Sequence, residues 1–238
     1  TEPAIYILLA TFNGGRFLAE QLASLGAQED GNWRLLVYDD GSTDGTREYL
    51  KEMPPPPGQE VRIFFHDRNR GKGAALRAGF QYALDAGCAA VVMLDADGQH
   101  APDEIPRFLE AFAADPAPDL VIGSRDYSQM PTVRRISNTI GRRAYSWALG
   151  QDVPDNQSGY RLLSRRMMES MLASDEHGFE FEVEMITRCV VQGCRLGWVP
   201  IRTIYAGETS HIQPVQHVIQ FARIVWQTRQ RVQQARRG

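Results

Sequence analysis

The chain has 238 residues, of which 43% are hydrophobic and 23% are charged, and its formal net charge is −3. This composition indicates one well-packed domain, or one domain with a short appendage, and argues against disorder and against a general nucleic-acid binder. The three cysteines form no Cys-x-x-Cys pair, which indicates reduced thiols in a cytoplasmic protein. No secretion signal and no run of about 18 apolar residues is found, so we expect a membrane to be touched at most and not crossed.

Strands and helices alternate along the first half of the chain. Short apolar runs predict strands at residues 5–9, 35–38, 61–65, 91–94 and 120–125. Helical spacing or helix signals predict helices at 17–25, 74–84 and 102–114, and a further helix capped by Ser42 or Thr43. This alternation predicts an α/β fold, a three-layer αβα sandwich with a mostly parallel central sheet.

Carboxylates directly follow two of the predicted strands. Asp39 and Asp40 follow the second strand, and Asp95 and Asp97 follow the fourth. Ligands of parallel α/β sheets bind outside the carboxyl ends of the strands, so we expect these side chains to line a crevice. Together with Gln99, the later pair supplies the oxygen ligands that Mg²⁺ or Mn²⁺ prefers. A plain turn, which Asp and Gly also favour, is the alternative.

A lysine between two glycines follows the third strand. The segment Gly71-Lys72-Gly73 lacks the spacing of a Walker loop and the Ser or Thr after its lysine. Its backbone amides and the Lys72 charge could still face a phosphate or a base at the start of a helix. The alternative is a glycine-rich turn that only begins that helix.

The second half of the chain is richer in arginine. We expect a helix at 130–149, a polar loop from Asp155 running into a strand at 161–163, a helix within 179–191 and a last strand at 198–205 with Pro200 at a sheet edge. The acidic residues Glu180, Glu182 and Glu184 could bind sugar hydroxyls or mark an exposed helix start.

The predicted closing helix, at about 214–236, is basic and amphipathic. It carries Trp226 at the margin of an apolar stripe, and no acidic residue follows Glu208. Such a helix can lie on an anionic membrane surface or pack on its own domain. We therefore expect a main domain at 1–212 and a basic amphipathic helix at 213–238.

The ordered motifs of the chain resemble those of the family 2 inverting glycosyltransferases of the GT-A fold. The resemblance is strongest to the polyprenyl-phosphate (dolichyl-phosphate) hexosyltransferases and covers roughly residues 4–205. The motifs that carry it are Ala10-Thr11-Phe12-Asn13, Asp39-Asp40-Gly41-Ser42-Thr43-Asp44, Asn69-Arg70-Gly71-Lys72-Gly73-Ala74-Ala75, Asp95-Ala96-Asp97-Gly98-Gln99, Gly123-Ser124-Arg125 and Gln157-Ser158-Gly159-Tyr160-Arg161.

The resemblance implies transfer of a hexose, mannose or glucose, from a GDP- or UDP-sugar to polyprenyl phosphate, with Mg²⁺ or Mn²⁺, in the cytoplasm or at the cytoplasmic membrane face. It assigns the donor nucleotide to Thr11, Asn13, Asp39, Asp40, Lys72 and Asp95. The implied metal ligands are Asp95, Asp97 and Gln99. The implied acceptor-phosphate residues are Arg125, Arg134, Arg135, Ser158 and Arg161, and the catalytic set is Asp97, Arg125 and Asp155.

Two alternatives concern the acceptor and the activity. Ala10 and Gly14 replace the family's usual Pro and Glu, and residues 13–22 resemble rhamnosyltransferases that extend surface glycans. A glycan hydroxyl would need a base, for which Asp155 is the candidate, whereas a phosphate arrives as an anion and needs cations. A non-catalytic nucleotide-sugar sensor is the further alternative. The sequence leaves the sugar, the nucleotide, the choice between Arg134 and Arg135, and the oligomeric state open.

Overall fold

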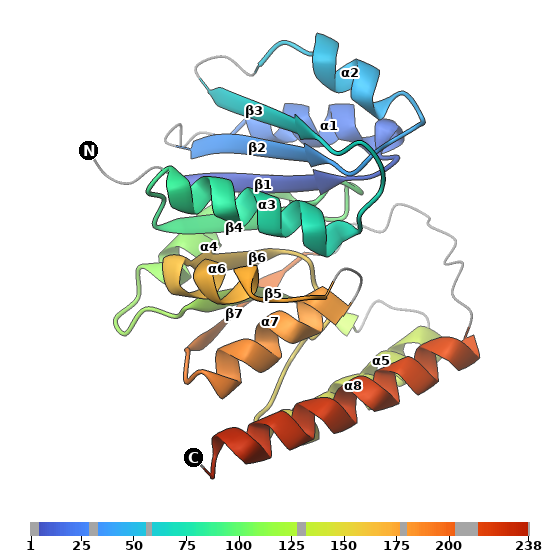
Figure 1. The fold of residues 1–238 in the computed structure, drawn as a ribbon, viewed down its shortest axis with the longest axis vertical. Helices are drawn as coiled ribbons and strands as arrows, with labels where there is room; N and C mark the ends of the chain where they lie inside the picture. Colours follow the sequence, from blue (N-terminus) through green and yellow to red (C-terminus); the bar gives the residue numbers. More distant parts are fainter. Residues whose placement is uncertain are drawn as a thin grey trace.

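The protein is described here by a computed structural model that covers residues 5–28, 33–55, 59–127, 132–176, 180–202 and 214–237. Its centre is a seven-stranded sheet with the order β3-β2-β1-β4-β6-β5-β7 (Figure 1). Every neighbouring pair is parallel except those of β6, which runs antiparallel to β4 and β5. The strands are β1 (Ile5–Thr11), β2 (Trp33–Asp39), β3 (Glu60–Phe65), β4 (Ala90–Asp95), β5 (Leu120–Arg125), β6 (Arg161–Ser164) and β7 (Leu196–Ile201).

Helices cover both faces of this sheet. Their bounds are α1 (Gly15–Gly26), α2 (Thr46–Glu52), α3 (Lys72–Asp85), the 3₁₀ helix η1 (Pro102–Glu104), α4 (Ile105–Phe112), α5 (Thr132–Leu149), α6 (Arg165–Leu172), α7 (Glu180–Val191) and α8 (Pro214–Ala235). One core cluster joins the sheet to α3, α6 and α7, and the other joins it to α1, α2 and α4. The predicted three-layer, mostly parallel α/β architecture is therefore confirmed.

The central strands are apolar throughout because both of their faces are buried. In β1, Leu8 packs into one core cluster while Ile7 and Leu9 pack into the other, and all three are fully buried. A central strand between two helical layers has no solvated face, so it reads as a continuous apolar run. The cysteines Cys88, Cys189 and Cys194 are buried as thiols, without a disulfide, as expected.

Several predicted boundaries differ from the structure. Gly45, not Ser42 or Thr43, precedes α2, because the Ser42 hydroxyl accepts a hydrogen bond from the Asn13 amide instead. The helix predicted at 102–114 is divided into η1 and α4 and ends at Phe112. The last strand begins at Leu196, two residues before its predicted start, and its predicted end at 205 lies outside the described residues. β7 does lie at the sheet edge, as Pro200 indicates.

The closing helix α8 packs on α5 and α7. Figure 1 shows α8 and α5 side by side at one end of the molecule, with β3 and α2 at the other. Thr228 and Val232 form the buried side of α8. The predicted boundary at 212–213 lies outside the described residues. Among the described helices, none combines the length and apolar content needed to span a bilayer.

Candidate active site

The carboxyl ends of β2, β1 and β4 lie at one level of the sheet. Thr11 is paired in register with Asp39, and its neighbour Ala10 is paired with Asp95. In a parallel sheet, adjacent strands therefore deliver these polar side chains to a common edge. The predicted grouping of Thr11, Asp39 and Asp95 at one edge agrees with this strand register.

Asp39 presents an unpaired oxygen at this edge. The carboxylate is fully buried, and its Oδ2 accepts a hydrogen bond from the Ser42 amide at 3.2 Å and lies 3.4 Å from Arg47 Nε. Among the described residues, its Oδ1 has no hydrogen-bond partner, and neither has the buried Thr11 Oγ1. Buried polar atoms are normally paired, so these two atoms mark a place where a polar ligand could bind.

Asp40 holds the turn that begins α3. Its Oδ1 accepts a hydrogen bond from the Arg70 amide at 2.9 Å and lies 2.7 Å from His66 Nδ1, and its Oδ2 accepts one from the Gly71 amide at 2.8 Å. Both oxygens are thus engaged by the protein. The nucleoside contact implied for Asp40 is not supported by this arrangement, which instead positions Lys72.

The Lys72 ammonium group lies between two carboxylates. It pairs with Asp95 Oδ1, and it lies 2.6 Å from Glu182 Oε1. Burial raises the pKa of Asp95, but the nearby Lys72 charge outweighs this effect and lowers the pKa to about 2. For Lys72, burial lowers the pKa, and attraction to Asp95 and Glu182 reverses this and raises it above its ordinary value. Lys72 and Asp95 are therefore both charged at neutral pH.

The segment after β4 is a turn that carries the predicted metal ligands Asp97 and Gln99. Gly98 has a φ of 74°, and the Gln99 amide donates to Asp97 Oδ1 at 2.9 Å. Asp95, Asp97 and Gln99 therefore follow the strand in a fixed loop. Among the described residues, no group of three or more His, Cys, Asp or Glu side chains is arranged to hold a metal ion.

The loop before β6 touches Asp95 through a glycine. A Cβ added at Gly159 would lie 2.1 Å from Asp95 Oδ2, far inside contact distance. Only glycine lets this loop approach the carboxylate so closely. In the same loop, the buried Asn156 Nδ2 and Ser158 Oγ have no hydrogen-bond partner in the part of the chain that the structure describes.

Arg125 and Asp155 form a bidentate ion pair at the end of β5. Arg125 Nε donates to Asp155 Oδ2 at 2.6 Å, and Nη2 donates to Oδ1 at 3.0 Å. Asp155 also accepts hydrogen bonds from the amides of Gln157 and Ser158. Burial raises the pKa of Asp155, but the hydrogen bonds from Arg125 more than offset this, so the pKa is lowered. Such a carboxylate is a weak base.

The remaining arginines are placed differently from one another. Arg161 is fully buried and donates to the carbonyl oxygens of Ser158 and Glu182, while its Nη2 has no partner among the described residues, so the acceptor contact implied for it stays a prediction. Arg135 is exposed in the first turn of α5. The side chain of Arg134 lies outside the described residues.

Glu182 is one of three acidic residues for which the sequence left sugar binding or an exposed helix start open, and the structure places it beside Lys72. Glu182 is only 4% exposed and forms an ion pair with Lys72. For Glu180, a position at the start of the helix remains a sufficient explanation. The alternation of acidic and apolar residues along 180–184 does not show which glutamate belongs to the site, because Lys72, the partner of Glu182, is far away in the sequence. The lysine of the Gly71-Lys72-Gly73 motif was the one feature of the sequence that pointed to an acidic partner.

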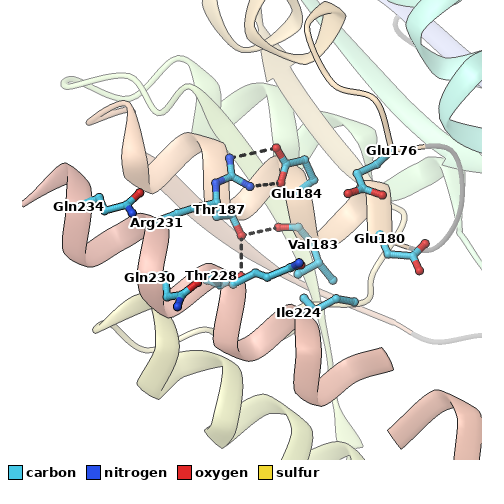
Figure 2. A pocket seen from close by; sticks show the side chains of 11 residues that line it. Glu176, Glu180, Val183, Glu184, Thr187, Ile224, Thr228, Gln230, Arg231 and Gln234 are labelled. Carbon is cyan, nitrogen blue, oxygen red and sulfur yellow. Dashed lines mark hydrogen bonds and ion pairs between the residues drawn. The ribbon is translucent and has the colours of Figure 1, made fainter. Parts of the chain in front are cut away.

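A separate cavity of about 330 Å³ lies between α7 and α8, away from the strand ends. Figure 2 shows Thr187 with Thr228, and Glu184 with Arg231, facing each other across it. Thr187 Oγ1 lies 3.3 Å from Thr228 Oγ1, and Arg231 Nη1 donates to Glu184 Oε2 at 2.5 Å. None of the residues that the resemblance implies for the donor, the metal ion or the acceptor lines this cavity, whereas Glu180 and Glu184, the possible ligands of sugar hydroxyls, do. Its contacts attach α8 to α7.

Residues 6–172 match the family described as glycosyl transferase family 2. The chain is 35% identical over 179 residues to a polyprenol monophosphomannose synthase of Mycolicibacterium smegmatis, with 70% of this chain and 65% of that relative covered. It is 33% identical to an undecaprenyl-phosphate mannosyltransferase of Micrococcus luteus, with 70% of each chain covered. The chain thus spans slightly less than two thirds of the first relative's length.

The structure is also similar to solved structures. It matches glucosyl-3-phosphoglycerate synthase from Mycobacterium tuberculosis, crystallised with Mn²⁺, UDP and phosphoglyceric acid, with a TM-score of 0.69 and 19% identity over 95% of this chain and 77% of that one. At this identity the likeness shows the fold, and it confirms the GT-A-type architecture expected from the sequence.

Proposed function

Because this chain belongs to glycosyl transferase family 2, we propose that it transfers a hexosyl group from a nucleoside diphosphate sugar to a polyprenyl phosphate. The names of two relatives support the acceptor, since both specify a polyprenol or undecaprenyl phosphate product or substrate. The structural observation that carries the proposal is the Arg125–Asp155 pair, which offers a cation and no effective base. A phosphate acceptor is already an anion and needs a cation, whereas a hydroxyl acceptor would need a base.

The donor nucleoside is assigned to the ends of β1 and β2. Asp39 Oδ1 and Thr11 Oγ1 are buried and unpaired, so a base or ribose that donates a hydrogen bond would satisfy the carboxylate. Asn13 links the loop after β1 to the loop after β2, because its Oδ1 accepts a hydrogen bond from the Thr43 amide at 2.9 Å. GDP- and UDP-sugars are the proposed donors.

A divalent cation, Mg²⁺ or Mn²⁺, fits the residues after β4. Asp95 is ionised because Lys72 lowers its pKa, and Asp95, Asp97 and Gln99 supply the hard oxygen atoms that both ions prefer. Gly159 lets the loop before β6 lie directly against Asp95 Oδ2, so any other residue there would displace this carboxylate. When bound, the ion would neutralise charge that develops on the departing diphosphate.

The protein's own charges would place the two substrates. The Lys72 ammonium group, held by Glu182, lies beside Asp95 and would attract the donor diphosphate. Asp155 fixes the Arg125 guanidinium so that it can orient an acceptor phosphate, since guanidinium groups match phosphate oxygens and stay charged. Arg135, exposed in the first turn of α5, is the second candidate for that phosphate.

The proposed reaction needs no proton abstraction. The second ionisation of a phosphate monoester has a pKa near ~6, so the acceptor is already an anion at neutral pH. One of its oxygens forms a bond to the anomeric carbon while the bond from that carbon to the diphosphate breaks. The electron pair of the broken bond leaves with the nucleoside diphosphate, and the configuration at the anomeric carbon inverts.

A transfer assay tests this proposal. The protein would be incubated with radiolabelled GDP-mannose, UDP-glucose or UDP-N-acetylglucosamine, with polyprenyl phosphate, and with Mn²⁺ or EDTA. We expect label in the lipid extract only with polyprenyl phosphate and only with the metal ion. Unphosphorylated polyprenol and soluble oligosaccharides are the matched control acceptors. Label in the oligosaccharide would establish the hydroxyl-acceptor alternative, and donor binding without transfer or hydrolysis would establish the sensor alternative.

A further inference from the structure

The outer face of α5 carries large apolar side chains in solvent. Ile136, Ile140 and Trp147 are 54%, 63% and 57% exposed. Their spacing of four and seven residues places them on one side of the helix. Tyr145 lies on the other side, fully buried, and its hydroxyl donates to the Val183 carbonyl at 2.8 Å. The exposed stripe therefore faces away from the protein core.

The outer face of α8 continues this surface. Trp226 is 61% exposed, whereas Thr228 and Val232 on the opposite side are buried against the domain. Arg229 joins the two helices, because its guanidinium lies 5.0 Å from the centre of the Trp147 ring and its Nη1 donates to the Trp147 carbonyl at 3.3 Å. The contacts between α7 and α8 in Figure 2 hold the inner side of α8 in place.

This two-helix surface is uniformly basic. Neither the α5 sequence nor the α8 sequence contains an aspartate or a glutamate. Arg135 and Arg143 on α5, Arg223 on α8 and Arg237 just after it are all exposed. The chain as a whole has a net charge of −3, whereas the two helices that expose these isoleucine and tryptophan side chains carry arginines and no acidic residue.

We propose that the outer face of α5 and α8, formed by Ile136, Ile140, Trp147 and Trp226 with the surrounding arginines, binds the surface of an anionic lipid bilayer. An interfacial helix inserts apolar and aromatic side chains at headgroup depth while its basic residues meet anionic lipids. A two-fold-related copy of the chain is disfavoured as the occupant, because it would place this basic face against itself.

Contact of α5 with a bilayer would also affect the candidate active site. Arg125 ends β5, and α5 begins at Thr132 shortly afterwards in the chain. A bilayer held against α5 would keep a lipid-linked phosphate close to the carboxyl end of β5. This consequence depends on the proposed function, whereas the membrane contact itself depends only on exposure and charge.

Vesicle sedimentation with the full chain, without donor or acceptor, tests the contact. We expect binding to phosphatidylcholine vesicles that contain phosphatidylglycerol, weak binding to pure phosphatidylcholine, and release by salt. Replacing both tryptophans (Trp147→Ala with Trp226→Ala) should lower the partition coefficient by about tenfold or more. Replacing two arginines (Arg143→Gln with Arg223→Gln) should lower it by about fivefold for each residue.

Matched controls lie at the other end of the molecule. Tyr49→Ala on α2 removes an aromatic side chain that is 39% exposed, and Arg62→Gln on β3 removes an exposed arginine. Both should bind vesicles like the wild type. The inference is overturned if the arginine variant binds as tightly as the wild type, or if phosphatidylglycerol makes no difference. It is also overturned if the variants abolish self-association, measured by analytical ultracentrifugation, while vesicle binding stays unchanged. Loss of glycosyl transfer alone would leave it standing.

Discussion

Lys72 acts as an internal counterion for the carboxylate that ends β4. Its ammonium group pairs with both Asp95 and Glu182, and Asp40 fixes the turn that carries it. Removing one partner of such a buried group would leave an uncompensated charge, which is costly. Each of these acidic side chains therefore contributes to stability as well as to the chemistry that we propose.

Stability should depend on pH through Asp95. Its pKa is about 2 in the folded protein, below that of the unfolded chain. The ionised carboxylate therefore stabilises the fold above the unfolded pKa of about 3.9, and this contribution is lost as the pH falls toward about 2. We expect Asp95→Asn to lower the free energy of unfolding by about 2 kcal/mol at neutral pH and by less as the pH falls from about 5 to about 3.

Urea unfolding at a series of pH values measures this difference. Asp85→Asn, at the exposed end of α3, removes a carboxylate far from Lys72 and should show no such trend. A difference between Asp95→Asn and the wild type that stays constant with pH would contradict the assigned ion pair.

Asp97 should matter for turnover more than for folding. Asparagine can still accept the hydrogen bond from the Gln99 amide, so the turn after β4 should survive the change. It cannot supply the negative charge that a divalent cation needs. We expect Asp97→Asn to lower kcat by about 100-fold or more. The transfer assay would be run beside a melting curve, with Asp67→Asn on the loop after β3 as the matched control. Retention of full activity would remove Asp97 from the metal site.

At the scale of elements, the loop before β6 and the end of β4 depend on one glycine. Because a Cβ at Gly159 would lie 2.1 Å from Asp95 Oδ2, Gly159→Ala must displace the loop or the carboxylate. Overpacking of this kind costs about 1–3 kcal/mol. We expect lower stability and loss of transfer activity together, measured by urea unfolding and by the transfer assay.

Gly141→Ala is the matched control for this substitution. In the middle of α5, the added methyl group would meet the Phe221 ring at 3.5 Å, which is an ordinary contact. Alanine also suits a helix interior better than glycine, by about 1 kcal/mol. The control should therefore be as stable as the wild type or more stable. Equal behaviour of the two variants would contradict the close approach at Gly159.

Sequence patterns predicted most elements of the first half, because a strand buried on both faces is a continuous apolar run. They also placed Asp39 and Asp95 at strand ends, since polarity begins where such a strand stops. The cap of α2 was predicted wrongly because Ser42 bonds to Asn13, which is 29 residues away. Local patterns contain no information on such a partner.

At the scale of the whole molecule, the sheet joins two sets of functional residues. The parallel strands β3-β2-β1-β4 carry the residues assigned to the donor, and β6, β5 and α5 carry those assigned to the acceptor. The insertion of β6 between β4 and β5 brings the Gly159 loop against Asp95. Neither this order nor the burial of Arg161 could be predicted, because both depend on pairing between distant segments. The pattern of apolar residues predicts where the strands are in the sequence, but not which strands are neighbours in the sheet.

Binding of the donor should therefore stabilise the whole fold. The contributions of the metal ion and of the nucleoside to this stabilisation can be measured separately with two variants. A ligand at about 100 times its Kd stabilises the native state by about 2.7 kcal/mol, which for a chain of this size raises Tm by roughly 5–10 °C. We expect GDP or UDP with Mn²⁺ to produce such a shift, measured by differential scanning fluorimetry. Asp97→Asn should lose the Mn²⁺-dependent part of the shift, because it removes a proposed metal ligand. Thr11→Val should lose the part that the nucleoside alone produces, because it removes the unpaired hydroxyl beside Asp39. If every nucleotide shifts both variants as it shifts the wild type, the strand ends are not the donor site.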